Sequence, residues 1–449
     1  MKTILTVGLI LTCMGALTQN LSSPPLIADE DGILSIWQKP FDVNNFFIVP
    51  YINFDDPQRN LKNIADCYFN TSGLWLPEKD FEQCEQLGLN VLVSSRENPF
   101  FSTNEKWKIP DEEVDAFVRK MVSGSGNSKA IVGYDICDEP DVPDYPKLAV
   151  AVEAVHKYAP GKLAFINLYP VLEPMSRTGV NTYQEYVEQF VEVVKPDIIS
   201  YDNYMALYSM DQKNRNMMAT FYMNMMTVYA ASQKYKIPWW NVVASNQIRY
   251  HTVIPTLDNM MLQAYTSLAA GASAVCWYTY YDTEYDYAPV NTKGMRTNTW
   301  YALREVNRHL SILGPIIKTL KSTGVYFTDP TIHPSLPLLP GKTVKEIECS
   351  EPLMIGEFES AKGNRYVMVV NISLEHSARF ILKTDIENER LFVVSTGEQT
   401  PYFQEILSTV ARGGYIPKNE PQERLARSVE NAYWIPAGQG VLIKCSNQK

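Results

Sequence analysis

The sequence predicts an α/β fold, a (β/α)8 TIM barrel, followed by a smaller all-β antiparallel sandwich domain. Eight short β-rich runs alternate with helical patterns between residues 41 and 321. Because parallel strands are joined by helical crossovers, this alternation indicates a closed parallel sheet surrounded by helices. Beyond residue 321 the runs are short, alternate in polarity and are separated by turn residues, which is typical of an antiparallel sandwich.

The first 20 residues have the pattern of a signal peptide. The basic Lys2 precedes an apolar run over residues 4–17, and polar residues follow at 18–20. This run is too short to span a membrane comfortably, so we expect export and no membrane span. Cys13 matches a lipoprotein cleavage site only poorly, which makes a lipid anchor the less favoured alternative. Residues 21–40 contain Pro and Ser and are expected to form a linker or an arm.

Segments with helical periodicity separate most of the predicted barrel strands. In the clearest one, apolar residues between 183 and 194 recur at the spacing of one buried helix face. A doubly wound open sheet is the alternative, but no Gly-rich phosphate loop follows any of the strands. The predicted strands are residues 46–53, 65–71, 90–94, 130–137, 163–168, 198–204, 239–245 and 272–280.

The fourth of these strands leads directly into acidic residues. Its apolar run, 130–137, is followed by Asp138, Glu139 and Pro140. In a (β/α)8 barrel the loops after the strands converge at one end, and catalytic groups lie there. Glu139 is therefore the first candidate for a catalytic acid. In the alternative interpretation these residues merely end the strand and cap the next helix.

Residues 322–449 are predicted to form the sandwich and to pack against the barrel. Few aromatic residues in this segment stand in a row, as a sugar-stacking surface would require, so we expect a structural role. The predicted strands are residues 354–358, 365–371, 378–382, 391–395 and 440–444.

Charge and residue spacing argue against nucleic acid, metals and cofactors. The net charge of −10, the pI near 5.2 and the lack of a dense Lys/Arg cluster argue against nucleic acid. No cysteine pair has CxxC spacing and the His residues lack metal-ligand spacing, so we expect no metal and no cofactor. Two disulfides, Cys67–Cys84 and Cys349–Cys445, are hypotheses that spacing alone does not decide. His251 is a less favoured substrate contact.

Polar and aromatic residues follow most of the predicted strands. Carboxylates, amides, one Arg and several rings at one rim suit a sugar, whose hydroxyls need donors and acceptors and whose C–H faces stack on rings. A carbohydrate is therefore the expected substrate. The candidate substrate contacts are Asn70, Arg96, Asn167, Tyr201, Tyr204, Gln247, Trp277, Tyr280 and Glu284.

Four motifs give a more specific resemblance. Together they resemble secreted bacterial glycoside hydrolases of the β-galactosidase/β-agarase-like kind in clan A, whose (β/α)8 barrels are often followed by a β-sandwich. The resemblance implies hydrolysis of O-glycosidic bonds and a location in the periplasm, at the cell surface or outside a bacterium. A Glu after the fourth strand is the general acid/base of that clan, which implies this role for Glu139. The motifs are Gly133-Tyr-Asp-Ile-Cys-Asp-Glu-Pro140, Phe165-Ile-Asn-Leu-Tyr-Pro170, Lys195-Pro-Asp-Ile-Ile-Ser-Tyr-Asp-Asn-Tyr204 and Gly271-Ala-Ser-Ala-Val-Cys-Trp-Tyr-Thr-Tyr280.

The second catalytic group departs from the clan. The clan's nucleophile is a Glu that ends the seventh strand, whereas residues 239–247 contain no carboxylate. Glycosidic cleavage needs a second group opposite the acid, and three schemes stay open. Asp202 or Glu284 replaces the nucleophile or base, or Asp138 orients an N-acetyl group of the substrate. The last scheme follows from a resemblance to N-acetylhexosaminidases that use an adjacent Asp-Glu pair.

We therefore predict a secreted hydrolase of poly- or oligosaccharides in which Glu139 is the acid and Asp202 is the first choice of partner. One alternative is a substrate-assisted N-acetylhexosaminidase that uses Asp138 and Glu139. The other is a carbohydrate-binding barrel without turnover, which the carboxylate-free seventh strand motivates.

Overall fold

The structure, a computed structural model, describes residues 46–51, 60–75, 81–172, 174–204, 206, 215–248, 252–281, 285–386, 389–397, 403–406 and 432–447. The predicted signal peptide, residues 1–20, and the predicted arm, residues 21–40, lie outside these residues, as do Cys13, His251 and Glu284. None of the helices in the described ranges combines the length and the apolar character that a membrane crossing requires.

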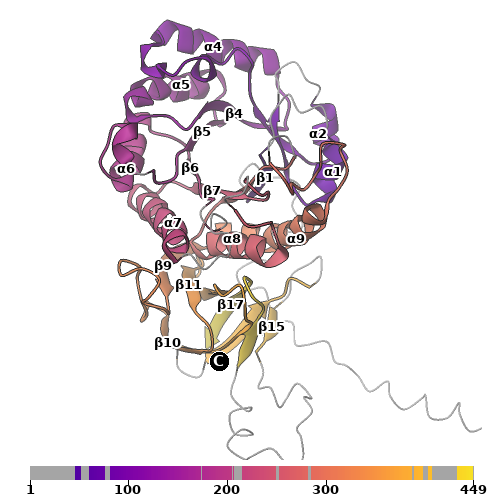
Figure 1. Cartoon of the computed structure of the whole chain (residues 1–449), viewed down its shortest axis with the longest axis vertical. Coiled ribbons are helices and arrows are strands. Elements are labelled where there is room, and N and C mark those ends of the chain that lie inside the picture. Colours follow the sequence, from indigo (N-terminus) through magenta and orange to yellow (C-terminus); the bar gives the residue numbers. More distant parts are fainter. Residues whose placement is uncertain are drawn as a thin grey trace, which may run out of the picture.

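Eight parallel strands form one sheet that curves into a barrel (Figure 1), which confirms the predicted fold class. Their hydrogen-bonded order is β1-β8-β7-β6-β5-β4-β3-β2. Asn70 joins the two ends of this order, because its Nδ2 donates to Phe46 O at 2.7 Å and its Oδ1 accepts from Ile48 N at 2.8 Å. The strands are β1 (Phe47–Pro50), β2 (Thr71–Trp75), β3 (Asn90–Val93), β4 (Ile131–Asp138), β5 (Leu163–Leu168), β6 (Ile199–Asp202), β7 (Trp239–Ala244) and β8 (Ala274–Tyr278).

Helices surround the barrel strands (Figure 1). The predicted helix over residues 183–194 is present and begins with a capping box, in which Thr182 Oγ1 accepts from Glu185 N at 3.1 Å and Glu185 Oε2 accepts from Thr182 N at 3.1 Å. The α-helices are α1 (Leu61–Asp66), α2 (Glu82–Gln86), α3 (Pro99–Ser102), α4 (Asp111–Ser125), α5 (Tyr145–Tyr158), α6 (Tyr183–Val194), α7 (Arg215–Tyr235), α8 (Leu257–Ala269) and α9 (Asn298–Thr319). Three short 3₁₀ turns are η2 (Lys106–Lys108), η3 (Val142–Asp144) and η4 (Met175–Thr178).

The second barrel strand differs from its prediction. Residues 65–71 contain the end of α1 and a turn, and β2 begins only at Thr71. Asn60 caps α1 by accepting a hydrogen bond from Asn63 N at 3.0 Å, and Leu61 and Ile64 are buried at helical spacing. The prediction was wrong because a buried helix turn and a buried strand are both short apolar runs.

Alternation along the barrel strands separates two apolar clusters. Phe47, Val132, Phe165 and Trp240 belong to the cluster inside the barrel, where the ring of Trp240 lies 5.3 Å from that of Phe47 and 5.6 Å from that of Phe165. The alternate residues pack between the strands and the helices. A strand-end residue therefore contributes to a site in the barrel mouth only if its side chain belongs to the inner set.

Beyond α9 the chain forms two antiparallel sheets, which confirms the predicted all-β fold. The six-stranded sheet has the order β15-β14-β17-β12-β11-β9 and the three-stranded sheet the order β10-β13-β16. A second core lies in this part of the chain and includes Leu353, Val367, Val369 and Phe380. The strands are β9 (Lys321–Phe327), β10 (Val344–Cys349), β11 (Leu353–Glu359), β12 (Arg365–Asn371), β13 (Ala378–Thr384), β14 (Glu389–Val394), β15 (Phe403–Glu405), β16 (Tyr433–Ile435) and β17 (Gly440–Asn447).

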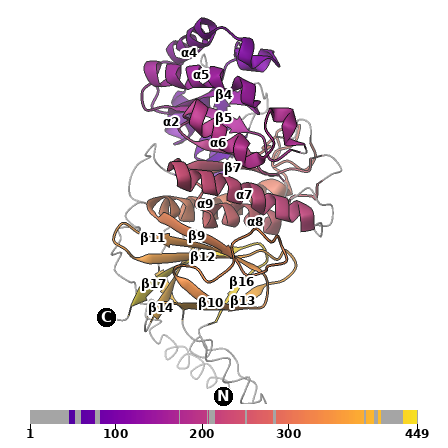
Figure 2. The ribbon, with the colours of Figure 1, turned by 90° about the vertical axis from the view of Figure 1, so that its left-hand side faces the viewer.

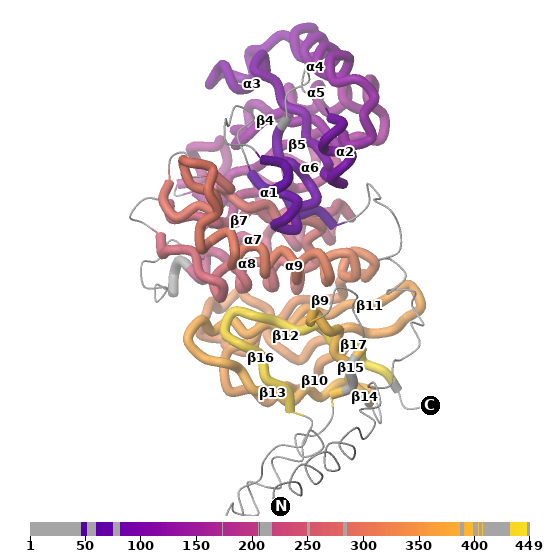
Figure 3. Tube along the Cα trace, turned by 90° about the vertical axis from the view of Figure 1, so that its right-hand side faces the viewer, coloured from indigo at the N-terminus to yellow at the C-terminus, as the bar shows by residue number. Residues whose placement is uncertain are grey.

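The sandwich packs against α8 and α9 at the side of the barrel (Figures 2 and 3). At Gly356 of β11 an added Cβ would lie 2.0 Å from Ala269 O of α8, so only glycine allows this close approach. On its other side α8 holds the end of β7. Gln263 Oε1 accepts from Ala244 N at 3.0 Å, and Gln263 Nε2 donates to Ala244 O at 3.1 Å. One helix therefore contacts both the sandwich and a barrel strand.

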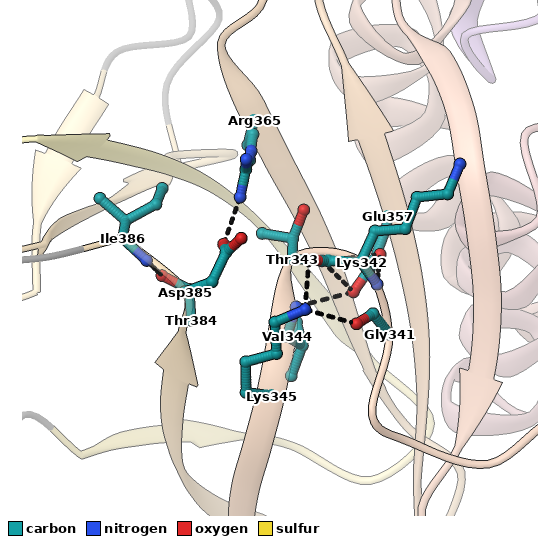
Figure 4. A network of polar contacts seen from close by, with 10 residues as sticks. All are labelled: Gly341, Lys342, Thr343, Val344, Lys345, Glu357, Arg365, Thr384, Asp385 and Ile386. Carbon is teal, nitrogen blue, oxygen red and sulfur yellow. Dashed lines mark hydrogen bonds and ion pairs between the residues drawn. The ribbon is translucent and has the colours of Figure 1, made fainter.

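A buried carboxylate organises the start of the sandwich (Figure 4). Glu357 of β11 is fully buried, and its oxygens accept hydrogen bonds from the backbone N–H groups of Lys342, Thr343 and Val344 at 2.7 to 3.1 Å. Gly341 lies against the same carboxylate, where a Cβ would meet Glu357 Oε1 at 2.2 Å. The loop that leads into β10 is thus wrapped around one side chain.

The two proposed disulfides are absent. Cys67, Cys84, Cys349 and Cys445 are thiols that form no disulfide, as are the other two described cysteines. Cys67 and Cys84 are buried among apolar side chains, and Cys67 Sγ lies 3.8 Å from Trp300 O. The first two cysteines therefore serve as small core residues.

Candidate active site

The end of β4 is irregular where it meets the acidic residues. Its pairing with β5 shifts between Asp135 and Cys137, which inserts an extra residue into β4, and Glu139 then adopts a left-handed backbone conformation with φ of 46°. Glu139 N donates to Asn167 O at 2.8 Å, which holds this conformation. Consecutive strand residues normally point to opposite faces. The bulge and the left-handed residue together allow Asp138 and Glu139 to face the same group of side chains.

Asn167 at the centre of the site links two carboxyl groups. Its Nδ2 donates to Asp138 Oδ1 at 3.1 Å and to Asp202 Oδ1 at 2.8 Å, while its Oδ1 accepts from Ser200 Oγ at 2.8 Å. Asn167 is 1% exposed and Asp202 is 5% exposed. Because all these bonds are made inside the protein, the amide fixes the separation of Asp138 on β4 from Asp202 on β6.

Three tyrosines surround the carboxyl groups. The hydroxyl of Tyr51 hydrogen-bonds Asp138, and the hydroxyl of Tyr204 hydrogen-bonds Asp202. The ring of Tyr278 lies between them, with its centroid 5.5 Å from Tyr51 and 5.2 Å from Tyr204, and it stacks on the latter. The site therefore combines oxygen acceptors with aromatic surface, which suits a polyhydroxylated ligand.

Burial keeps protons on this cluster near neutral pH. Burial raises the pKa of Glu139 to about 7; the Asp138 carboxylate adds to this shift, whereas a hydrogen bond with Asp202 and the charge of Lys106 oppose it. Burial also raises the pKa of Asp202 well above its ordinary value, with further contributions from Asp138 and Glu139. Burial likewise raises the pKa of Asp138, against the effect of its hydrogen bonds from Asn167 and Tyr51. A protonated carboxylic acid is thus available to a substrate at neutral pH.

A fourth carboxyl group lies deeper in the barrel. Asp135 is 2% exposed, and its Oδ2 accepts a hydrogen bond from Ser94 Oγ at 2.7 Å. Burial raises the pKa of Asp135 to about 7, the bond from Ser94 lowers it, and Asp138 raises it further. Asp135 therefore couples electrostatically to the residues above it.

The structure brings together five of the residues singled out from the sequence. Glu139, Asp138, Asp202, Asn167 and Tyr204 form one connected cluster at the carboxyl ends of β4, β5 and β6. Within the described residues no group of three or more His, Cys, Asp or Glu side chains has the geometry to hold a metal ion. The arrangement can donate a proton and bind hydroxyl groups.

Three predicted substrate contacts face away from this cluster. Tyr201 packs on Trp239 with 6.1 Å between ring centroids, and both belong to the layer between strands and helices. Trp277 Nε1 donates to Asn307 Oδ1 of α9 at 2.8 Å. Tyr280 accepts from Trp300 Nε1 of the same helix at 2.9 Å. These predictions were wrong because Tyr201 and Trp277 are outward residues of the alternating pattern, and Tyr280 turns toward α9.

Other predicted contacts lie elsewhere or serve the backbone. Asn70 precedes β2, at the opposite end of the barrel from Asp138, and closes the sheet as described above. Arg96 is exposed and lines a hollow of about 340 Å³ against α4. Gln247 stays at the rim, but its Nε2 donates to Thr252 O at 2.9 Å and its backbone N to Asp286 O at 2.8 Å. The structure thus places Asn70 and Arg96 outside the connected cluster. Glu284 lies outside the described residues.

Sequence reasoning missed Tyr51 and Asp135. Ser94 and Tyr278 stand among the polar and aromatic residues at the ends of the predicted strands, but they were not chosen as candidate contacts. Tyr51 and Tyr278 supply a hydroxyl and a ring, and Asp135 and Ser94 form the deeper pair. A strict count of alternate residues would have selected Tyr278, two positions after Cys276 of the inner cluster. Tyr51 follows Val49 of the same cluster by two positions in the same way.

No family model matches the chain, and no curated sequence matches it. Solved structures with a similar fold include GH5_18 from Streptomyces cattleya in complex with GlcNAc, at 11% identity over 59% of this chain and 80% of that chain, with a TM-score of 0.45. A cold-adapted β-galactosidase from Rahnella sp. R3 has 11% identity over 64% of this chain and 59% of its own, with a TM-score of 0.48. The GH51 arabinofuranosidase from Xanthomonas axonopodis pv. citri has 8% identity over 91% of this chain and 98% of its own, with a TM-score of 0.42. These three solved structures are a GH5_18 protein, a β-galactosidase and a GH51 arabinofuranosidase, and their likeness to this chain concerns the fold alone.

Proposed function

We propose that the protein is a glycoside hydrolase that cleaves O-glycosidic bonds of poly- or oligosaccharides, with Glu139 as the general acid. One observation carries this proposal: Glu139 is half-buried at the end of β4 and its pKa is raised to about 7. A carboxylic acid that is still protonated near neutral pH can give its proton to the leaving glycosidic oxygen. The tyrosine rings beside it support a sugar as the ligand.

The partner of Glu139 separates the possible mechanisms. The two carboxyl groups of a retaining pair stand about 5–5.5 Å apart and those of an inverting pair about 6.5–9.5 Å apart. The Glu139 and Asp202 carboxyl groups instead share a hydrogen bond that lowers the pKa of Glu139, and burial raises the pKa of Asp202 well above its ordinary value. A protonated Asp202 is a poor nucleophile. Its hydrogen bond to Glu139 favours a role in holding the acid.

The same observation favours a substrate-assisted reaction. In this scheme the acetamido oxygen of an N-acetylated sugar attacks the anomeric carbon while the bond to the leaving oxygen breaks and Glu139 protonates that oxygen. Water then attacks the anomeric carbon of the cyclic intermediate, the bond from that carbon to the acetamido oxygen breaks, and Glu139 takes a proton from the water. In this scheme Asp138 orients the acetamido N–H, and the hydrogen bonds that Asn167 and Tyr51 donate to Asp138 support this role. A carbohydrate-binding protein without turnover is the competing function.

Export is part of the proposal, and the residue pattern at 1–20 supports it. Fractionation of cells that produce the full chain, followed by mass measurement of the mature N-terminus, tests it. A protein that keeps Met1 to Asn20 and stays inside the cell would rule export out.

The test of function is hydrolysis of a panel of aryl glycosides and N-acetylated aryl hexosaminides. Glu139→Gln should lower kcat/KM by roughly 10²–10⁴-fold on substrates with poor leaving groups, because the amide has no proton to give. The exposed Glu153→Gln on α5 is the matched control and should leave the rate unchanged. Equal rates for Glu139→Gln and wild type would exclude Glu139 as the acid. Binding of a sugar by both, with turnover by neither, would support the binding protein.

Asp202→Asn then separates the two mechanisms. If Asp202 is the nucleophile, the amide abolishes turnover on every substrate. If Asp202 donates a hydrogen bond to Glu139, the Asn side chain keeps a donor and kcat/KM stays within roughly tenfold of wild type. Activity confined to N-acetylated sugars together with an active Asp202→Asn variant would support the substrate-assisted reaction.

A further inference from the structure

An aromatic side chain at the rim of the barrel has no role in the proposed reaction. Tyr285 lies in the loop between β8 and α9, and its side chain is partly exposed. The centroid of its ring lies 6.0 Å from that of Tyr278, and the two ring planes meet at 60°, so the rings do not stack face to face. Tyr285 therefore extends the aromatic surface of the candidate active site beyond the end of β8.

Two further rings connect Tyr285 to the carboxyl cluster. Tyr278 stacks on Tyr204, and the hydroxyl of Tyr204 bonds Asp202. The rings of Tyr204, Tyr278 and Tyr285 thus follow one another at centroid separations of 5.2 and 6.0 Å. A sugar ring is about as wide as a tyrosine ring, so a single sugar unit held beside the carboxyl groups does not cover all three. The outer ring is left for a neighbouring unit.

The backbone of the loop fixes Tyr285 in this place. The next residue, Asp286, accepts a hydrogen bond from Gln247 N at 2.8 Å, in an antiparallel bridge between the loops that follow β7 and β8. Further along the same loop, Val290 N donates to Tyr280 O at 3.0 Å. The ring is therefore attached to two strand ends before a ligand arrives, and a surface ordered in advance loses less conformational entropy on binding.

The side chains along this path are accessible, as a ligand requires. Tyr51, Tyr278 and Tyr285 are all partly exposed, and so is Glu139. Each tyrosine presents an apolar ring and one hydroxyl that both donates and accepts hydrogen bonds. Rings of this kind pack on the C–H faces of sugars, and the hydroxyls pair with sugar hydroxyls.

We infer that Tyr285 is a substrate-binding residue for a second sugar unit, adjacent to the unit that lies at the carboxyl cluster, so that affinity rises with the length of the sugar chain. This inference rests on the proposed function and deepens it, because it makes an oligosaccharide a better substrate than the glycoside of a single sugar. The competing role is structural, in which Tyr285 only supports the ring of Tyr278.

The experiment measures sugar affinity by calorimetry in a Glu139→Gln background, so that binding is read without turnover. The probes are N-acetylglucosamine with its β-1,4-linked dimer and trimer, and galactose with its β-1,4-linked dimer and trimer. The parent should bind the trimer of one series more tightly than the single unit. Tyr285→Ala should weaken binding of that trimer roughly three- to tenfold, and binding of the single unit by less than about twofold.

Two variants serve as controls. Tyr285→Phe keeps the ring and should bind every probe as the parent does. Tyr301→Ala removes a ring that is 60% exposed on α9, away from the carboxyl cluster, and should leave every affinity unchanged.

An equal loss of affinity for the single unit and the trimer in Tyr285→Ala would show that the ring only supports Tyr278, and would overturn the inference. A parent that gains no affinity from one unit to three in either series would overturn it as well, as would a Tyr285→Ala variant that keeps the whole gain. None of these readouts depends on turnover, so a failure of Glu139 as the acid would appear in the hydrolysis test and not here.

Discussion

Glu139 and Asp202, on two different strands of the barrel, share a hydrogen bond between their carboxyl groups. Such a bond requires a proton on one of them, and burial raises the pKa of both carboxyl groups. The acid of the proposed reaction is therefore not an isolated carboxyl group. Its ionisation depends on the neighbours that surround it, and the pH dependence of turnover should report on them.

Asp138→Asn should move the alkaline limb of the pH profile to lower pH. Glu139 acts in its protonated form, so activity should fall as pH rises through about 7. The charge of Asp138 contributes to the raised pKa of Glu139, and its removal lowers that pKa, although burial still keeps it above the ordinary value of 4.5. The measurement is kcat/KM of wild type and variant from pH 5 to pH 9. An unmoved limb, whatever the rate, would contradict this coupling.

Asp135→Asn should stabilise the protein at neutral and alkaline pH. The folded pKa of Asp135, about 7, lies above its ordinary value of 3.8, so the folded state binds more protons between these values and stability falls as pH rises through them. About three pKa units correspond to ~4 kcal/mol, an upper limit for the gain of the variant above pH 7. Below pH 4 the gain should vanish. Urea denaturation of both proteins at pH 4 and pH 8 checks this, and a pH-independent difference would disprove it.

Glu357→Gln should destabilise the sandwich by ~2–4 kcal/mol. The amide nitrogen of Gln would oppose backbone N–H groups that now donate to a carboxylate, and the loop before β10 would lose part of its anchor. Glu346→Gln is the control, because Glu346 is exposed and its ion pair with Lys383 is at the surface. Denaturant midpoints measure both. If the two substitutions cost the same, the buried carboxylate is not the anchor that Figure 4 shows.

Gly356→Ala should loosen the contact between the sandwich and the barrel. The new Cβ would overlap Ala269 O, a backbone atom that cannot rotate away, so β11 or α8 must shift. We expect a lower Tm and faster proteolysis between the two parts of the chain. Gly397→Ala, where the nearest atom is Ser395 Oγ at 3.6 Å, should have little effect. An unchanged Tm for Gly356→Ala would show that this contact tolerates a methyl group.

The fold was predictable from sequence because both of its periodicities are strong. Alternating strands and helices predicted the barrel, and polar alternation after α9 predicted the sandwich. The exception was the second strand, whose predicted residues 65–71 contain the end of α1 and a turn. Short apolar runs of this kind do not distinguish a helix from a strand. Because of this error, Asn70 was predicted at the carboxyl end of a strand, whereas it precedes the amino end of β2.

The site was predictable only in part. Asp138 and Glu139 were found because they come at the end of an apolar strand. Asn167 and Asp202 were found because they lie near the carboxyl ends of β5 and β6. Tyr201 and Trp277 were misplaced because the sequence gives the strand but not the face that each residue occupies. The bulge between Asp135 and Cys137 also reverses the alternation, so the faces of the residues after it cannot be counted from those before it. Alternation predicts the face that Tyr51 occupies, but the hydrogen bond of Tyr51 to Asp138 and that of Ser94 to Asp135 join different strands, which no local pattern contains.

The helix α8 links the sandwich to the barrel. Its outer side contacts Gly356 of β11, and on its inner side Gln263 makes two hydrogen bonds to the backbone of Ala244 at the end of β7. The helix α8 alone therefore separates the sandwich from the end of β7 and contacts both. A barrel produced without the sandwich would keep every carboxyl group of the site, yet it would support that strand end with a helix that has one face in water.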